Sequence, residues 1–235
     1  MSLKAYGVGM AQRKRAGFAK FRHLVATALM AIMPLSGVMA EPITMLALGD
    51  SLTAGYGLDQ GRGFVPQLEA WLRKNGKDIN LVNGGVSGDT TAGGYARLGW
   101  SLSDEVDMVM VNLGGNDMLR GLPPSETRRN LAAIMAELEG RDLPVILIRV
   151  PGSLNFGPDD KAAYDAIFPD LAQQHQALFI PNFFAALEEQ AEAKAAMQDL
   201  MQPDGLHPTA RGISLIVEQI GPQVLDWINK AENSH

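Results

Sequence analysis

One serine in this chain stands where a nucleophile of an α/β enzyme would stand. Ser51 lies in Gly49-Asp50-Ser51-Leu52, directly after the apolar run over residues 44–48. Such a run predicts a buried strand, and ligands of open α/β sheets bind where strands end. A serine hydroxyl attacks well only when a base removes its proton. From this segment alone, the alternative that Asp50 and Ser51 merely cap a turn or helix stays open.

His207 is the histidine best placed to be that base. Asp204 precedes it by three residues, close enough to hold the imidazole in one tautomer and to stabilise its charged form. Pro208 disfavours a helical conformation at His207 and is suited to open a helix. The alternative is a capped turn with a surface histidine. The other histidines lie near the chain ends or in a polar helical stretch: His23, His175 and His235.

Two further segments could supply hydrogen-bond donors to a developing negative charge. Gly88, in Ser87-Gly88-Asp89, can present its backbone N–H without a Cβ in the way, and Asn116 carries a side-chain amide. Each could equally be a turn or a cap. Both segments follow predicted strands, as Ser51 does, and the carboxyl ends of parallel strands share one edge of a sheet. We therefore expect these groups to converge into a site for acyl transfer.

The elements that would position these residues alternate along the chain. Short apolar runs predict strands at 44–48, 79–82, 108–113, 145–150 and 178–180. Amphipathic stretches predict helices at 65–75, around 94–98, and at 125–139, 161–176, 188–201 and 208–230. We expect Ser125 to cap one helix, Gly140 to end it, and Gly221-Pro222 to kink or split the last one. The alternation predicts an α/β fold with a five-stranded parallel sheet in flavodoxin-like order between two helical layers.

The first forty residues differ from the rest. They hold six basic and no acidic residues, then an apolar stretch ending in Val38-Met39-Ala40. This pattern is typical of a signal peptide cleaved after Ala40, with Met10 as an alternative start. A membrane anchor is the alternative, although Pro34 interrupts the stretch. We expect residues 41–235 to form a single exported domain, periplasmic or secreted, with no stable membrane span.

Charge and composition narrow the partners of that domain. Of 20 basic and 26 acidic residues in the chain, 14 and 26 remain after residue 40, a net charge of about −12. So acidic a domain is a poor nucleic-acid binder, because phosphate contacts need clustered Lys and Arg. The chain has no cysteine, which excludes disulfides and thiol catalysis. No heptad pattern is present, and we expect a monomer.

Taken together, four ordered segments resemble the SGNH (GDSL) hydrolase family, within it the bacterial periplasmic thioesterase/lysophospholipase/arylesterase group. The likeness covers roughly residues 43–228. Its segments are 49–56 (GDSLTAGY), 83–91 (NGGVSGDTT), 113–121 (LGGNDMLRG) and 204–208 (DGLHP). The resemblance implies Ser51 as nucleophile, His207 as general base and Asp204 as its orienting partner. It also implies an oxyanion hole from the Ser51 and Gly88 N–H groups and the Asn116 side chain.

The resemblance implies substrate contacts as well, in a loop over 117–122 and in the loop after the fourth strand. The residues assigned to substrate binding there are Asp117, Leu119, Leu122, Leu154 and Phe156. No metal or cofactor is implied. The expected substrates are small carboxylic esters and lysophospholipids, with thioesters as a further class. A carbohydrate O-acetyl esterase is the alternative enzyme, and a non-catalytic lipid- or glycan-binding module the alternative outside enzymes.

Overall fold

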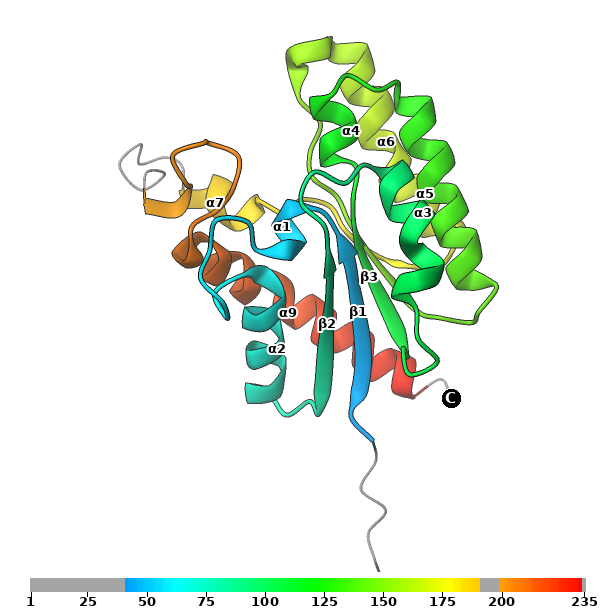
Figure 1. Ribbon diagram of the computed structural model, residues 1–235, viewed down its shortest axis with the longest axis vertical. Helices are drawn as coiled ribbons and strands as arrows, with labels where there is room; N and C mark the ends of the chain where they lie inside the picture. The colour runs from blue at the N-terminus through cyan, green and yellow to red at the C-terminus, as the bar shows by residue number, and fades with distance from the viewer. Residues whose placement is uncertain (1–40, 191–198, 234–235) are drawn as a thin grey trace, which may run out of the picture. The chain divides into compact units, whose positions relative to one another are not determined.

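A single parallel sheet organises the part of the chain that the computed structural model describes, residues 41–190 and 199–233. Its strands run in the order β2-β1-β3-β4-β5, as Figure 1 shows in part. Their bounds are β1 Ile43–Gly49, β2 Ile79–Gly85, β3 Met108–Asn112, β4 Val145–Ile148 and β5 Leu178–Ile180. This is the flavodoxin-like order, so the fold prediction is confirmed.

Helices cover both faces of the sheet. They are α1 Ser51–Ala54, α2 Phe64–Lys74, α3 Thr91–Ser101, α4 Gly115–Leu119, α5 Pro124–Glu139, α6 Pro158–Gln174, α7 Ala185–Gln190 and α9 Ala210–Glu232, with a 3-10 turn η1 at Leu154–Phe156. Helices α2 and α9 pack against each other on one face of the sheet (Figure 1). On the other face, α5 packs between α3 and α6. The layers are therefore helix, sheet, helix, because every parallel strand needs a crossover.

Strands β1, β3 and β4 are largely apolar because both faces of the sheet are buried there, whereas the edge strand β2 is partly exposed. In β1, Met45 and Ala47 join the core under α2 and α9, whereas Leu46 and Leu48 join the core under α3, α5 and α6. All four side chains are at most 1% exposed. This alternation divides the interior into two cores with the sheet between them.

Two predicted helix starts are wrong. Ser125 does not cap α5, because Pro123 occupies the cap position and Pro124 is the first helical residue, where a missing N–H costs nothing. Pro208 does not open the last helix either. Thr209 is its N-cap, with a side-chain oxygen that accepts the N–H of Gly212. Gly140 ends α5 as predicted.

The last helix is also not split. Helix α9 runs unbroken from Ala210 to Glu232 with Pro222 inside it. A Cβ on Gly221 would lie 2.7 Å from the ring of Trp71, so the glycine allows α9 and α2 to pack closely at this point. This tertiary packing outweighs the local preference against proline.

Further differences concern helices near the carboxyl edge of the sheet. Helix α3 begins three residues earlier than predicted, because the Thr90 side chain caps it through the N–H of Gly93, and it runs on to Ser101. Helix α4 was not predicted as a helix. Of the helix predicted over 188–201, the described residues include the end of α7, at Gln190, and two helical residues at 199–200; residues 191–198 lie outside the described ranges.

The predicted leader and its cleavage after Ala40 also lie outside the described ranges. In the portion that is described, none of the helices is long and apolar enough to cross a membrane.

The connections reverse direction at β1. The chain leaves β1 to form β2 on one side and returns to form β3 on the other. In doubly wound sheets, such a reversal leaves a crevice beyond the carboxyl ends of the strands, where ligands bind. Ser51, Gly88 and Asn116 lie in the segments that directly follow β1, β2 and β3, Ser51 at the start of α1 and Asn116 in α4.

Candidate active site

Ser51 is the first residue of α1, immediately beyond β1. Asp50 is the N-cap, and its Oδ1 accepts the N–H of Leu52 at 3.0 Å. Gly49 has no room for a side chain, because a Cβ would lie 2.9 Å from the carbonyl oxygen of Asn112 on the neighbouring strand. Asp50 therefore does cap the helix, which was the alternative left open by the sequence. The same arrangement places Ser51 at the carboxyl end of β1, where a nucleophile could act.

The three predicted catalytic side chains form one hydrogen-bonded row. Ser51 Oγ lies 2.8 Å from His207 Nε2, and His207 Nδ1 lies 2.7 Å from Asp204 Oδ2. The hydrogen bond from His207 lowers the pKa of Asp204 to about 2, assisted by the N–H groups of Leu206 and His207. Asp204 is therefore a carboxylate at neutral pH and can accept Nδ1–H. In that tautomer Nε2 is free to accept the Ser51 proton.

Gln202 and Tyr56, which were not predicted as site residues, support the loop that carries His207. The Gln202 side-chain amide donates to the carbonyl oxygens of Tyr56 at 2.8 Å and Pro208 at 3.0 Å. The backbone N–H of Gln202 donates to the carbonyl oxygen of His207 at 2.7 Å. The Tyr56 ring lies against the imidazole, with 4.6 Å between ring centroids. Tyr56 falls inside a family segment, whereas nothing in the sequence around Gln202 indicates its role.

Two backbone N–H groups of pocket-lining residues, those of Ser51 and Gly88, could bind an oxyanion. Gly88 has φ +86°, a conformation that favours glycine, in a turn closed by Asp89 N–H to Val86 O at 3.0 Å. In the described residues, neither Ser51 N–H nor Gly88 N–H donates a hydrogen bond to the protein. Both residues line the same pocket. The structure thus brings together the groups predicted for the oxyanion hole.

The Asn116 side chain, on α4, lines this pocket too but already has partners. Its Nδ2 donates to the carbonyl oxygen of Asp89 at 3.0 Å and to Asp50 Oδ2 at 3.2 Å. Both amide hydrogens are therefore used. To serve an oxyanion, the hydrogen in the longer bond, toward Asp50, must be shared with it or turn toward it.

Asp50 is a buried carboxyl group beside the nucleophile. It is 3% exposed, and burial raises its pKa to about 6, although the Leu52 N–H, His207 and the Asn116 amide act in the opposite direction. Because the native state holds this proton more tightly than the unfolded chain, Asp50 stabilises the fold below about pH 4. That stability is lost as the pH rises through 6.

We expect Asp50→Asn to remove this pH dependence. A shift from 3.8 to about 6 is worth about 3 kcal/mol of unfolding free energy in all, of which about 2 kcal/mol is lost between pH 4 and 7. Urea unfolding at pH 4, 5, 6 and 7 should show the wild type losing stability relative to the variant over this range. Stability curves that stay parallel would contradict the raised pKa.

The pocket beyond Ser51 has a volume of about 570 Å³ and a largely apolar lining. Its apolar lining residues are Leu52, Tyr56, Met118, Leu119, Val150, Pro151, Phe184, Leu187, Met201 and Leu206. Of the predicted substrate-binding residues, only Leu119 lines it. Leu122 and Phe156 line an adjoining hollow of about 280 Å³ that shares Met118 and Gly152 with it. Leu154 is 67% exposed and lines neither.

Asp117 does not reach the pocket. Its side chain is 0% exposed and accepts hydrogen bonds from the Thr91 N–H at 2.8 Å, the Thr91 hydroxyl and the Thr127 hydroxyl at 3.4 Å. It thereby joins α4 to α3 and α5. The structure makes Asp117 an internal tie between helices rather than a substrate contact.

Within residues 41–190 and 199–233, no group of three or more His, Asp or Glu side chains is arranged to hold a metal ion.

Comparison with known proteins agrees with this geometry. The model of the GDSL-like Lipase/Acylhydrolase family matches residues 47–214. Esterase TesA of Pseudomonas aeruginosa is 33% identical over 202 residues, which cover 86% of this chain and 96% of that protein. Thioesterase 1/protease 1/lysophospholipase L1 of Escherichia coli K12 is 32% identical over 188 residues, 79% and 85% of the two chains. The crystal structure of AlinE4, an SGNH-hydrolase family esterase, is 41% identical with a TM-score of 0.64, covering 80% of this chain and 97% of that one.

Proposed function

The chain belongs to the GDSL-like lipase/acylhydrolase family, and we propose that it hydrolyses carboxylic esters through an acyl-enzyme on Ser51. The observation that carries the proposal is the row Ser51–His207–Asp204, hydrogen-bonded at 2.8 and 2.7 Å and opening on an apolar pocket. A serine, a base and an orienting carboxylate in this order are the parts of a serine hydrolase.

Acylation follows from these contacts. His207 Nε2 takes the proton of Ser51 Oγ as that oxygen attacks the ester carbonyl carbon. The carbonyl oxygen becomes an oxyanion, which the N–H groups of Ser51 and Gly88 and the Asn116 amide stabilise. The tetrahedral intermediate collapses, the bond to the leaving oxygen breaks, and the imidazolium gives its proton to that oxygen.

Deacylation repeats the sequence with water. His207 takes a proton from a water molecule whose oxygen attacks the acyl carbon bound to Ser51. Collapse of the second intermediate releases the carboxylic acid, and Ser51 Oγ recovers the proton from His207. Asp204 remains ionised throughout and stabilises the imidazolium in both steps.

The pocket lining favours an acyl chain longer than acetyl. Each buried CH₂ contributes about 0.8 kcal/mol, so two methylenes are worth up to roughly tenfold in kcat/KM. We expect p-nitrophenyl butyrate to be hydrolysed about tenfold better than the acetate. A series from acetate to palmitate measures this. A maximum at acetate, with activity on acetylated glycans, would instead support a carbohydrate O-acetyl esterase.

Thioesters and lysophospholipids are the finer part of the proposal. The names of the Escherichia coli relative include both activities, and the pocket shows nothing specific to an oxygen leaving group. Assays with an acyl-CoA and a lysophosphatidylcholine, each repeated with Ser51→Ala, test the two classes. Turnover of a compound that is lost in Ser51→Ala would make its class a substrate of this site. Turnover of simple esters alone would exclude both thioesters and lysophospholipids as substrates.

We further propose that residues 1–40 are a cleaved export signal and that the remaining domain acts as a monomer in the periplasm or outside the cell. The supporting observations are the basic run and the small residues that end at Ala40. Intact mass and sedimentation of the protein recovered from the periplasmic fraction test both. A mass that retains residues 1–40 would contradict cleavage.

A further inference from the structure

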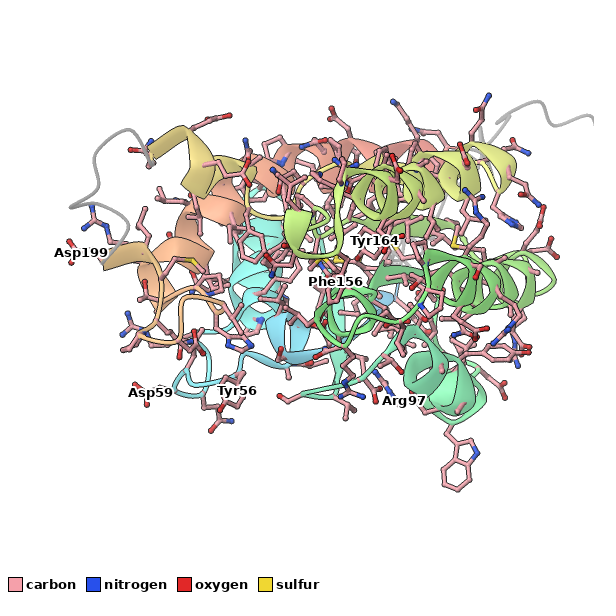
Figure 2. All side chains as sticks on the ribbon, turned by 90° about the horizontal axis from the view of Figure 1, so that it is seen from above. Tyr56, Asp59, Arg97, Phe156, Tyr164 and Asp199 are labelled. Atoms are coloured by element: carbon pink, nitrogen blue, oxygen red, sulfur yellow. The ribbon has the colours of Figure 1, made fainter. Side chains whose placement is uncertain are left out.

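Arg97, on α3, lies behind the active site and not among the residues that line the pocket. Its guanidinium makes two short contacts: Nη2 donates to the carbonyl oxygen of Gly49 at 2.8 Å, and Nε donates to Asp89 Oδ2 at 2.6 Å. The third donor, Nη1, lies 3.4 Å from Ser101 Oγ. Figure 2 labels Arg97 beside α3.

The partners of Arg97 belong to the segments that carry the oxyanion donors. The Gly49 carbonyl precedes Asp50-Ser51 and also accepts the N–H of Val86 at 3.0 Å, where the Gly88 turn begins. Asp89 ends that turn, with its N–H bonded to Val86 O. One guanidinium thus fixes the end of β1 to the turn that presents the Gly88 N–H.

The third oxyanion donor, the Asn116 side-chain amide, is connected to Arg97 through Asp89. The carbonyl oxygen of Asp89 accepts Asn116 Nδ2 at 3.0 Å, so the position of Asp89 also sets the position of the Asn116 amide. The segments bearing the Ser51 N–H, the Gly88 N–H and the Asn116 amide are therefore joined by one Arg97–Asp89 pair.

The surroundings leave the pair little freedom. The two side chains are 21% and 19% exposed, so their attraction is stronger than that of a surface pair. Space for the Asp89 carboxylate depends on Gly93, where a Cβ would lie 2.5 Å from Oδ1. A planar guanidinium can bind Gly49 and Asp89 together, whereas a lysine ammonium offers no such fork.

We propose that Arg97 is the positioning residue of the oxyanion site: it touches no substrate but, with Asp89, holds the three donors at the spacing that the tetrahedral intermediate requires. The inference rests on the proposed function. Donors displaced by about 1 Å lose about 10²-fold in rate, because stabilisation of the developing charge depends on preorganised geometry.

The test compares Arg97→Lys, Arg97→Gln and Asp89→Asn with the wild type. kcat and KM are measured with p-nitrophenyl butyrate, and inhibition with an alkyl trifluoromethyl ketone, whose adduct on serine carries an oxyanion. Arg128→Gln is the matched control, because Arg128 makes a 2.7 Å bond to Asp170 on the exposed surface of α5 and α6. Thermal unfolding of each variant checks the fold.

We expect kcat to fall about 10- to 100-fold for Arg97→Gln, less for Arg97→Lys, with KM within about twofold and the ketone bound more weakly by a factor similar to the loss in kcat. Arg128→Gln should match the wild type. Unchanged kcat and ketone affinity in folded Arg97 variants would overturn the inference, as would a rise in KM alone. Ser51→Ala in the same assay separates the role of Ser51 from that of Arg97. If Ser51→Ala keeps turnover, the proposed function is wrong. If Ser51→Ala abolishes turnover while the Arg97 variants keep wild-type kcat, only the proposed role of Arg97 is wrong.

Discussion

Ser51→Ala should lower kcat on p-nitrophenyl butyrate by about 10⁴- to 10⁶-fold. The Ser51 oxygen is the atom that His207 activates at 2.8 Å, and no other group at this position can form the acyl-enzyme. What remains after its removal comes from the oxyanion donors and from substrate binding. Steady-state and single-turnover assays on the folded variant measure the loss.

A matched control for this loss is Ser125→Ala. Ser125 is an exposed residue at the start of α5 and does not line the pocket. Its replacement should leave kcat and KM within about twofold of the wild type. Near-normal turnover in Ser51→Ala would contradict nucleophilic catalysis by Ser51 even if every geometric feature of the site were present.

Asn116→Ala is expected to have the second largest effect, a fall in kcat of about 10²- to 10³-fold with KM little changed. The Asn116 amide is within hydrogen-bond distance of Asp50 and Asp89 at the edge of the pocket, where an oxyanion would form. A donor that acts mainly in the transition state lowers kcat without weakening substrate binding.

A second variant separates donation from packing. Asn116→Asp preserves the shape of the side chain but replaces the donor amide with an acceptor, so its kcat should fall at least as far as that of Asn116→Ala. The affinity of a trifluoromethyl ketone should fall in both variants. If Asn116→Asp kept wild-type kcat, the amide would not donate to the oxyanion, and its role would be limited to its bonds with Asp50 and Asp89.

The sheet and the catalytic row could be predicted because their signals are local. An apolar run such as 44–48 is long enough for a buried strand and too short for a helix, and its parallel neighbours follow from the crossovers between them. Asp204 and His207 are three residues apart, so one loop can join them without knowledge of the rest of the fold. The convergence of Ser51, Gly88 and Asn116 follows from the shared edge of parallel strands.

The pocket could not be predicted in this way, because its wall is assembled from distant segments. Val150, Phe184, Leu187 and Met201 line it from three separate places in the chain, and nothing in their local sequence marks them. Asp117 shows the converse. It adjoins Asn116 in sequence, yet it is turned inward to Thr91 and Thr127, because α4 is a helix that the sequence did not reveal.

The predictions of helix boundaries were wrong for a related reason. Ser125 is a good cap by residue type, but two prolines before it set the backbone, and α5 begins one residue earlier. Pro222 is a poor helix interior residue, but α9 is held across it by packing against α2. In both cases the neighbouring residues or the tertiary packing outweighed the intrinsic preference of one side chain.

If Ser51 is the residue that becomes acylated, it should also be the residue that an alkyl fluorophosphonate labels. The reagent is attacked by an activated serine and leaves a stable phosphonyl group, which intact mass and peptide mass spectrometry can locate. We expect one phosphonyl group per chain on the peptide that contains Ser51, loss of turnover in proportion to labelling, and no label in Ser51→Ala. Labelling of a different residue, or full turnover in protein labelled at Ser51, would contradict acylation of Ser51.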